Sequence, residues 1–453
     1  MTWLQLRYEI VSPLNSFKRT MEGVHLYRNG VSPYDGDSCN ASPLLLAFLH
    51  WFTSNFGDSA VKWLFVTCDV VSAIVLQRAT VTALLQQYNN EENTLRRKDY
   101  VIDPGSPPVQ MSGLLVNPQH VRSLSLLAAA MYLFNPFAIA SAVAMTTTTI
   151  ENCLATLVFY SMIYNHYWRA LLYASLTGVL GLYPAVLVVP VLVRFRLANS
   201  DFSENDIADQ KQNGIRRDFT AVANGEADWS LFGMVSSENI PAQVAFDVVA
   251  YIGLLLVWLG ASWAATGGSW DFLTGTYGFV LTVPDLTPNF GVFWYFFTEM
   301  FDHFRNFFLC VFQLNMFVYV APLAIKLRHQ PHLLFILLLM LITIFKSYPT
   351  FGDICVYAAL LPSVRPLYPN IRHSFVVCCA VLTCSVLSVV MWELWIFAGS
   401  ANANFYFAVT LVYATAQIFL ATDLLYAYCR REIHLRYGLK PQLNGKDAKV
   451  VLE

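Results

Sequence analysis

The stretch FWYFFTEMFDHFRNFFLCVFQLN, residues 293–315, decides the class of the fold. Together with its flanks it forms an apolar segment, 290–325, that is longer than the about 20 residues that one membrane crossing needs. We therefore expect one helix that is tilted or extends past the bilayer. Glu299, Asp302 and His303 interrupt the apolar residues. Because charges are costly in hydrocarbon, these side chains should face other protein or a watery cavity.

Residues three and four apart lie on one face of a helix, so a single helix here would carry a polar stripe. The stripe would consist of Tyr295, Glu299, His303, Asn306, Cys310 and Gln313. Glu299 could pair with His303, and Asp302 with Arg305, each one turn away. The stripe is either a binding site or an internally paired contact between helices. A metal site at Glu299 and His303 would need further ligands that the sequence does not indicate.

The composition of the whole chain extends this prediction. Of 453 residues 56% are hydrophobic and only 13% are charged, whereas soluble domains carry about 25% charged residues. Long apolar runs predict an all-α, polytopic transmembrane bundle in one domain, 1–453, and argue against a barrel, which would show short alternating segments. A net charge of −2 gives no reason to expect a nucleic-acid partner. We expect roughly 10–12 spans, among 43–56, 60–77, 120–144, 148–165, 169–193, 243–266, 270–283, 290–325, 332–348, 351–363, 374–398 and 404–428.

Polar segments and basic clusters indicate the orientation of these spans. Cytosolic segments are rich in Lys and Arg, so we expect a cytosolic loop at 86–119, a cytosolic insert at 195–242 and a basic cytosolic tail at 429–453. The insert is poor in apolar residues and is predicted to be largely disordered. Segments with few basic residues should lie on the opposite, luminal side, together with a first loop at 10–42; they are 283–291, 347–353 and 398–405.

Polar residues in the predicted luminal loops are candidates for a binding site. Asn402 and Asn404 lie in GSANANFYF, where a span should begin. Their amides suit sugar hydroxyls or a phosphorylated head group, but they could equally cap and turn the chain. Lys346, in IFKSYPTFGD, could contact an anionic lipid or extend to the membrane surface.

Asp35 and Asp37 form a D-x-D pattern in the first loop. Two carboxylates so close can bracket a divalent cation, as in luminal enzymes that use lipid-linked sugars, yet Asp beside Gly is also common in turns. The nine cysteines are scattered without a Cys-x-x-Cys pair, so we expect neither a metal nor a cofactor.

Several segments together resemble the U subunit of the GPI transamidase, the PIG-U family. They include the first-loop motifs VSPLNSFKR (11–19) and EGVHLYRNGVSPYDGD (22–37), and then SPLLL (42–46), the run 269–315, PLAIKLRHQP (322–331), FKSYPTFGD (345–353), LWIFAGSANANFYFAVTL (394–411) and YAYCRREIHLRYGL (426–439). The likeness covers nearly the whole chain and is dense from about residue 269 to 438. It implies a fold similar to the GT-C membrane fold of multi-spanning lipid-linked-sugar mannosyltransferases.

The resemblance also implies a function. The transamidase of the endoplasmic reticulum membrane attaches GPI anchors to proteins, and its catalytic Cys and His belong to the protease-like subunit K. This chain is then expected to be a non-catalytic, multi-pass subunit that recognises or presents the GPI lipid. Its partners would be subunit K, the GPI-attachment protein and subunits S and T, and its C-terminus would be cytosolic. The family's lipid-contacting amides fall on Asn402 and Asn404.

Two departures from the family accompany the resemblance. Members of the family begin with a hydrophobic helix ahead of VSPL, where this sequence has only a short segment, so the expected luminal position of 10–42 lacks its usual leader. The insert at 195–242 is longer than the family usually carries. Two other functions stay open: a luminal mannosyltransferase that uses Asp35 and Asp37, and a pure scaffold without a lipid site.

Overall fold

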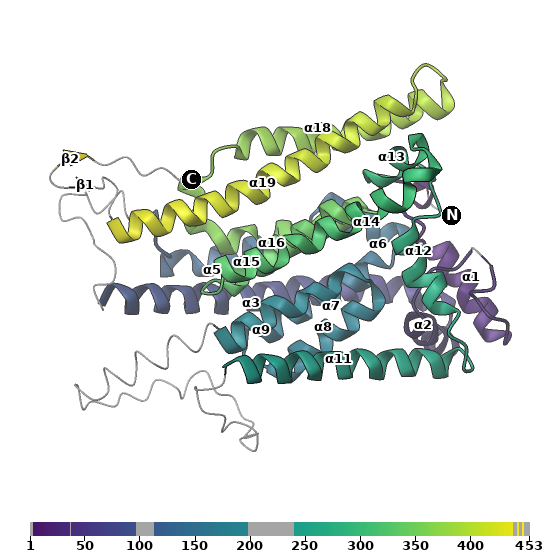
Figure 1. The fold of residues 1–453 in the computed structure, drawn as a ribbon, viewed down its shortest axis with the longest axis horizontal. Coiled ribbons are helices and arrows are strands. Elements are labelled where there is room, and N and C mark those ends of the chain that lie inside the picture. The colour runs from purple at the N-terminus through teal and green to yellow at the C-terminus, as the bar shows by residue number, and fades with distance from the viewer. Residues whose placement is uncertain are drawn as a thin grey trace.

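The computed structural model describes residues 3–36, 38–96, 113–197 and 240–437, and two short strands. The strands β1 (Gln442–Leu443) and β2 (Lys446–Asp447) pair antiparallel. Long helices that lie side by side make up nearly all of the rest (Figure 1).

The all-α class is confirmed. The helices are α1 (Phe17–Arg28), α2 (Pro43–Phe56), α3 (Val61–Arg96), α5 (Val121–Leu133), α6 (Pro136–Ala144), α7 (Thr148–Ile163), α8 (Tyr167–Leu180), α9 (Val188–Leu192), α11 (Ile240–Ala265), α12 (Phe279–Thr282), α13 (Phe293–Glu299), α14 (Asp302–Val318), α15 (Val320–Lys326), α16 (Pro331–Phe345), α17 (Cys355–Leu360), α18 (Ser374–Trp392) and α19 (Ala403–Tyr437).

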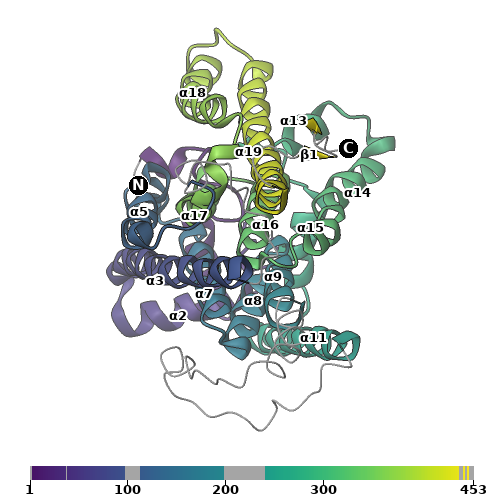
Figure 2. The same ribbon diagram turned by 90° about the vertical axis from the view of Figure 1, so that its left-hand side faces the viewer.

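Helix α16 forms the centre of the bundle. Its sequence, PHLLFILLLMLITIF, is apolar all round, and every residue from Leu333 to Ile344 is buried. A helix that is hydrophobic on all faces must be covered on all faces. The helices α7, α9, α14, α17 and α19 pack around it, and Figure 2 shows it between α19 and α9.

The outer helices α11, α14 and α18 expose apolar side chains away from the bundle. Leu256, Val257, Phe307 and Leu382 are each more than 60% exposed. Lipid is the solvent that suits such a surface. In the described part of the chain, five helices are long and apolar enough to cross a membrane, and six if the bent pair α5–α6 counts as one span. The chain is therefore a multi-pass membrane protein.

The bundle has two chemically different ends (Figure 1). The C-terminal ends of α3 and α19 lie at one of them. Arg431 on α19 binds Glu91 near the end of α3, and Arg194, which shares a helical turn with Arg196, binds Gln86 on α3, so we call this the basic end. The opposite end, which we call the loop end, holds α1, α2 and the connections that precede α13 and α19. The predicted luminal loops thus gather at one end of the molecule.

Some predicted boundaries were wrong. Residues 86–96 continue α3 instead of starting a loop, because Gln, Glu, Leu and Arg favour helices. Residues 429–437 likewise belong to α19 instead of a free tail. Most of the 195–242 insert lies outside the described residues; its ends belong to the π-helical turn η5 (Val193–Leu197) and to α11.

The segment 290–325 is not one helix. It divides into α13, α14 and α15, and the backbone is extended at Met300 and Phe301 (φ/ψ −83°/142° and −66°/134°). Asp302 begins the new helix α14, where a carboxylate is favoured by the positive end of the helix dipole. The predicted continuous polar stripe is therefore wrong.

Candidate functional site

Helices α13 and α19 meet at the loop end through a polar contact. The hydroxyl of Tyr295 donates a hydrogen bond to Oδ1 of Asn404, 109 residues away in the sequence. Asn402 lies just before α19, and its Oδ1 accepts a hydrogen bond from the backbone N of Asn404 at 3.1 Å. This is the geometry of a side chain that caps a helix N-terminus. Three predicted site residues thus come together, and both asparagines are exposed.

Aromatic rings hold this contact in place. Tyr295 packs on Phe407 with ring centroids 4.6 Å apart. Behind it, Trp294 contacts Trp395 and Tyr406, which come from the π-helical turn after α18 and from α19, at 6.2 Å each. Trp294 is 3% exposed. Such packing fixes the rotamers of the polar groups in front of it.

A buried ion pair near the N-terminus supports the same cluster. Arg7 binds Glu9 at 2.9 Å and Glu393 at 2.8 Å, and Arg7 and Glu9 are 4% and 1% exposed. Between them in the sequence, Tyr8 packs on Trp392 at 4.7 Å. The sequence analysis missed this network. The sequence feature that could have revealed it is the pair of opposite charges Arg7 and Glu9, two residues apart in the largely apolar WLQLRYEI.

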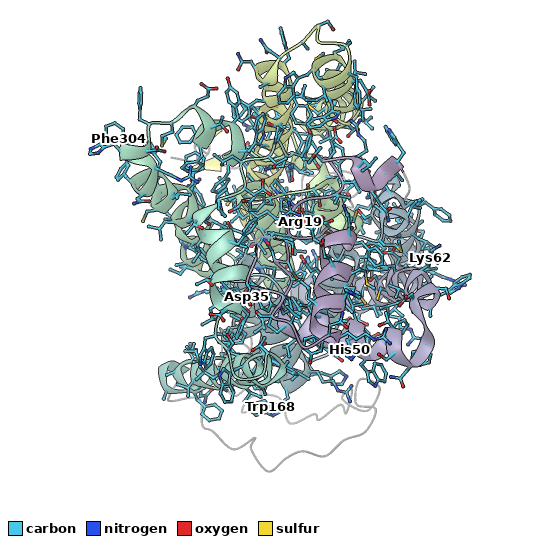
Figure 3. All side chains as sticks on the ribbon, turned by 90° about the vertical axis from the view of Figure 1, so that its right-hand side faces the viewer. Arg19, Asp35, His50, Lys62, Trp168 and Phe304 are labelled. Carbon is cyan, nitrogen blue, oxygen red and sulfur yellow. The ribbon has the colours of Figure 1, made fainter. Side chains whose placement is uncertain are left out.

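Glu299, Asp302 and His303 do not form the predicted pairs. All three are exposed, and the break at Met300 places Glu299 and His303 on different helices. They lie at the loop end beside the lipid-facing Phe304, which Figure 3 shows at the periphery.

Arg305 pairs with backbone instead of Asp302. Its guanidinium donates to the carbonyl of Val283 at 2.9 Å and lies over the ring of Phe297. Val283 follows the last residue of α12 with φ of 48°, where helix carbonyls lack partners within the helix. Arg305 therefore caps α12.

Gln313, the far end of the predicted stripe, is a contact between helices. It is 7% exposed, donates to the carbonyl of Val280 at 2.9 Å and accepts from the hydroxyl of Tyr183 at 2.7 Å. Of the two interpretations of the stripe, a binding site or a contact between helices, the structure supports the contact between helices for Gln313.

Lys346 lies in the interior and not at a lipid surface. It is 13% exposed, and its Nζ contacts Oδ1 of Asp353 at 2.7 Å. The other carboxylate oxygen of Asp353 accepts from the backbone N of Thr350 at 2.6 Å, in a capping box. The pair lines a cavity that is separate from the contact of Tyr295 with Asn404, because the two share no residue.

Asp35 lies in an exposed bend of the first loop, visible on the face shown in Figure 3. Asp37 lies outside the described residues. Asp35 is not one of the described residues that line the cavity. Its position is that of an ordinary turn residue. In the described part of the chain, no three His, Cys, Asp or Glu side chains gather as a metal site would require.

A second charged contact ties α1 to the loop before α13. Arg19 binds Asp285 at 3.2 Å, near the centre of the face shown in Figure 3. Burial alone would raise the pKa of Asp285, but hydrogen bonds from Thr287 and the Arg19 guanidinium outweigh it and hold this pKa below its ordinary value. Asp285 is therefore charged in the folded protein at neutral pH.

Comparisons with known proteins identify the family of this chain. The family model described as "GPI transamidase subunit PIG-U" matches residues 2–413. A human protein named "GPI-anchor transamidase component PIGU" is 36% identical over 448 residues, which cover 99% of this chain and 93% of the human protein. The "GPI transamidase component GAB1" of Saccharomyces cerevisiae is 27% identical over 424 residues, which cover 94% of this chain and 88% of the yeast protein. The chain belongs to the PIG-U family of GPI transamidase subunits.

Proposed function

We propose that this chain is a non-catalytic subunit of the GPI transamidase that recognises the polar head of the GPI lipid at its loop end. The observation that carries the proposal is the contact between Tyr295 and Asn404, which joins α13 to α19 and is flanked by exposed Asn402. The relatives' names support membership of the transamidase complex.

The chemistry of this surface suits a glycolipid head. Amides and a phenol both donate and accept hydrogen bonds without carrying charge, as sugar hydroxyls and phosphate esters require. Glu299 at the end of α13 and Asp302 and His303 at the start of α14 are exposed and can contact a ligand amine or hydroxyl. Lys346 is assigned to the interior cavity and not to this surface.

Exposed apolar side chains beside the polar contact suit the acyl chains of a lipid. Phe405 follows Asn404 directly and is 54% exposed, and Phe304 on α14 is 51% exposed. Farther along the same helices, Val412 and Leu314 continue the apolar surface. A polar head at the loop end and chains along α14 and α19 would match the amphipathic nature of the ligand.

The cysteines support a non-catalytic role. A cysteine nucleophile requires a thiolate that nearby cations or a histidine stabilise. Cys310 on α14 and Cys378 and Cys379 on α18 are exposed on lipid-facing helices, and no described histidine or cation is hydrogen-bonded to any of the three. We assign the transfer chemistry to the protease-like subunit K.

The distribution of charge supports an orientation. Cytosolic segments of membrane proteins are enriched in Lys and Arg, so the basic end and the C-terminus would face the cytosol and the loop end the lumen of the endoplasmic reticulum. The luminal surface would then be available to the GPI lipid, subunit K, the GPI-attachment protein and subunits S and T.

Variants in cells that lack the endogenous subunit test the proposal. Asn404→Ala combined with Tyr295→Phe removes two side-chain groups that would each give the lipid head a hydrogen bond of about 1 kcal/mol, so we expect about tenfold or greater loss of GPI-anchored reporter at the cell surface by flow cytometry. Asn402→Asp should also lower display, although Asp still caps α19. The matched control is Asn306→Ala, an exposed asparagine on α14.

Assembly must be measured in the same cells. Co-precipitation of the other subunits should be unchanged in all these variants, since the altered side chains are at the surface or half-buried. Normal reporter display in Asn404→Ala with Tyr295→Phe would refute lipid recognition at this surface. Lost assembly would support the pure-scaffold alternative.

A further inference from the structure

A cavity of about 100 Å³ lies inside the loop end of the bundle. Since a water needs about 10–15 Å³ on the same scale, the cavity has room for several waters or one sugar ring. Its walls come from the first loop, α7, the segment around Tyr183, and both ends of the connection after α16. Polar residues occupy much of the lining, among them Asn40, Ser42, Glu151, Lys346 and Asp353.

The charged groups in the cavity are one cation and two carboxylates. Lys346 is already paired with Asp353 at 2.7 Å, and Asp353 also accepts two hydrogen bonds from Thr350. Glu151 is the third charged group and interacts electrostatically with both members of the pair. No described residue is hydrogen-bonded to its carboxylate. The cavity thus disfavours an added anion and offers one carboxylate as an acceptor.

Two nearly fully buried polar side chains of the first loop lack partners. Asn40 is 7% exposed and Ser42 is 3% exposed, and Asn40 Nδ2 and Ser42 Oγ have no hydrogen-bond partner among the described residues. Both line the cavity. The residue between them is held in place, because the hydroxyl of Tyr34 donates to the carbonyl of Ala41 at 2.8 Å. Buried polar groups in native proteins are normally hydrogen-bonded, so these two indicate a missing partner.

We propose that this cavity binds a neutral polyhydroxylated group, a sugar or a cyclitol ring. Such a ring can donate to Glu151 and accept from Asn40 and Ser42 at the same time. An anion would be repelled by the carboxylates, and a simple cation would leave the Asn40 amide without an acceptor. The hydroxyl-bearing ring can belong to a lipid head group or to a free sugar. The cavity shares no residue with the contact of Tyr295 with Asn404 and extends beyond the proposed function.

Photolabelling of the intact complex in lipid nanodiscs tests this proposal. The probe is octyl mannoside that carries a diazirine on its sugar, and octanol with the same diazirine is the apolar control. We expect the sugar probe to label peptides that contain Asn40 or Glu151 at least fivefold more than the control probe. Competition by free methyl mannoside would indicate a site for free sugar. Labelling that resists this competitor would indicate a lipid-linked ring.

Two variants make the test specific. Asn40→Leu removes a side-chain amide donor without a partner in the described structure, so the fold should persist while labelling falls at least tenfold. Asn306→Leu, on the surface of α14, should label like the wild type. Asn402→Ala should leave labelling unchanged while it lowers reporter display, so the two proposals can fail separately.

The proposal is overturned by either of two results. One is labelling no stronger than that by the octanol probe, which would mean that the cavity holds water only. The other is wild-type labelling in an Asn40→Leu variant that assembles normally by co-precipitation.

Discussion

At the basic end of the bundle Arg431 is bound to Glu91 and to the carbonyl of Leu114, and Arg196 holds Asp247 through hydrogen bonds of 2.6 and 2.9 Å. At the loop end, by contrast, Asn402, Glu299 and Asp302 are exposed, and Asn40 and Ser42 are buried without described partners.

This difference separates polar groups that build the fold from those that are available to a ligand. A buried charge is tolerated when a partner of opposite charge and further hydrogen bonds replace its water. Arg431 and Asp247, 2% and 0% exposed, meet this condition. Asn40 and Ser42 lack such described partners and also line a cavity, and the two observations together make them candidates for binding.

The largest expected effect on stability is at the basic end. Arg431→Leu leaves Glu91, whose side chain is 8% exposed, as an unpaired buried carboxylate. We expect a loss of about 3–5 kcal/mol, because breaking a buried pair leaves the other charge uncompensated. The measurement is thermal unfolding of the purified complex. Arg430→Leu, the adjacent half-buried arginine, should have a much smaller effect.

The double variant Arg431→Leu with Glu91→Leu sharpens this test. It removes both charges, so much of the lost stability should return. If the double variant were as unstable as Arg431→Leu alone, the ion pair would not be the cause.

A smaller effect is expected from overpacking at the loop end. A Cβ atom on Gly352 would lie 2.6 Å from Ser141 Oγ and 3.2 Å from Thr148 Cγ2. Gly352→Ala should therefore destabilise the protein by about 1–3 kcal/mol in thermal unfolding. Gly253→Ala in α11 is the control, since a Cβ there meets nothing within 4 Å, and it should be neutral or stabilising.

A still smaller effect depends on pH. The pKa of Asp285 is lowered in the folded state. Its contribution to the free energy of unfolding is therefore fully present above its unfolded pKa and is lost as the pH falls through the folded pKa. Arg19→Leu should cost up to about 1 kcal/mol at pH 7, and this cost should shrink as the pH falls below about 4. Denaturation measured at pH 7, 5 and 3 tests this. Lys18→Leu, at the exposed residue next to Arg19, should show no such pH dependence. An equal cost of Arg19→Leu at every pH would contradict the stabilising ion pair between Arg19 and Asp285.

The smallest effect on stability is expected at an exposed carboxylate. Glu299→Gln should change the free energy of unfolding by no more than about 0.5 kcal/mol, as is usual for surface substitutions. Glu91→Gln is the matched change at a buried glutamate and should cost several times more, because Arg431 would lose its buried charged partner and keep only the more distant Glu432. Equal effects of the two substitutions would remove the distinction between the two ends.

Much of the fold could be predicted from the sequence. Apolar length predicted the membrane bundle, and the basic clusters predicted which connections share an end. The continuous helix over 290–325 was wrong because apolarity alone does not reveal the extended backbone at Met300 and Phe301. The contacts of the candidate site could be predicted only in part. The sequence singled out Asn402, Asn404 and Tyr295 as candidates, but it did not reveal the contact of Tyr295 with Asn404 across 109 residues.

The sequence by itself determined that this protein resides in a lipid bilayer. The hydrophobicity and the length of each segment can be read directly from consecutive residues. The tertiary structure alone decided which polar groups have partners. Glu91 and Arg431 are 340 residues apart, and the cavity is built from Asn40, Glu151 and Lys346 on three separate segments. Such partnerships depend on how helices pack against one another, and local patterns of residues do not encode that packing.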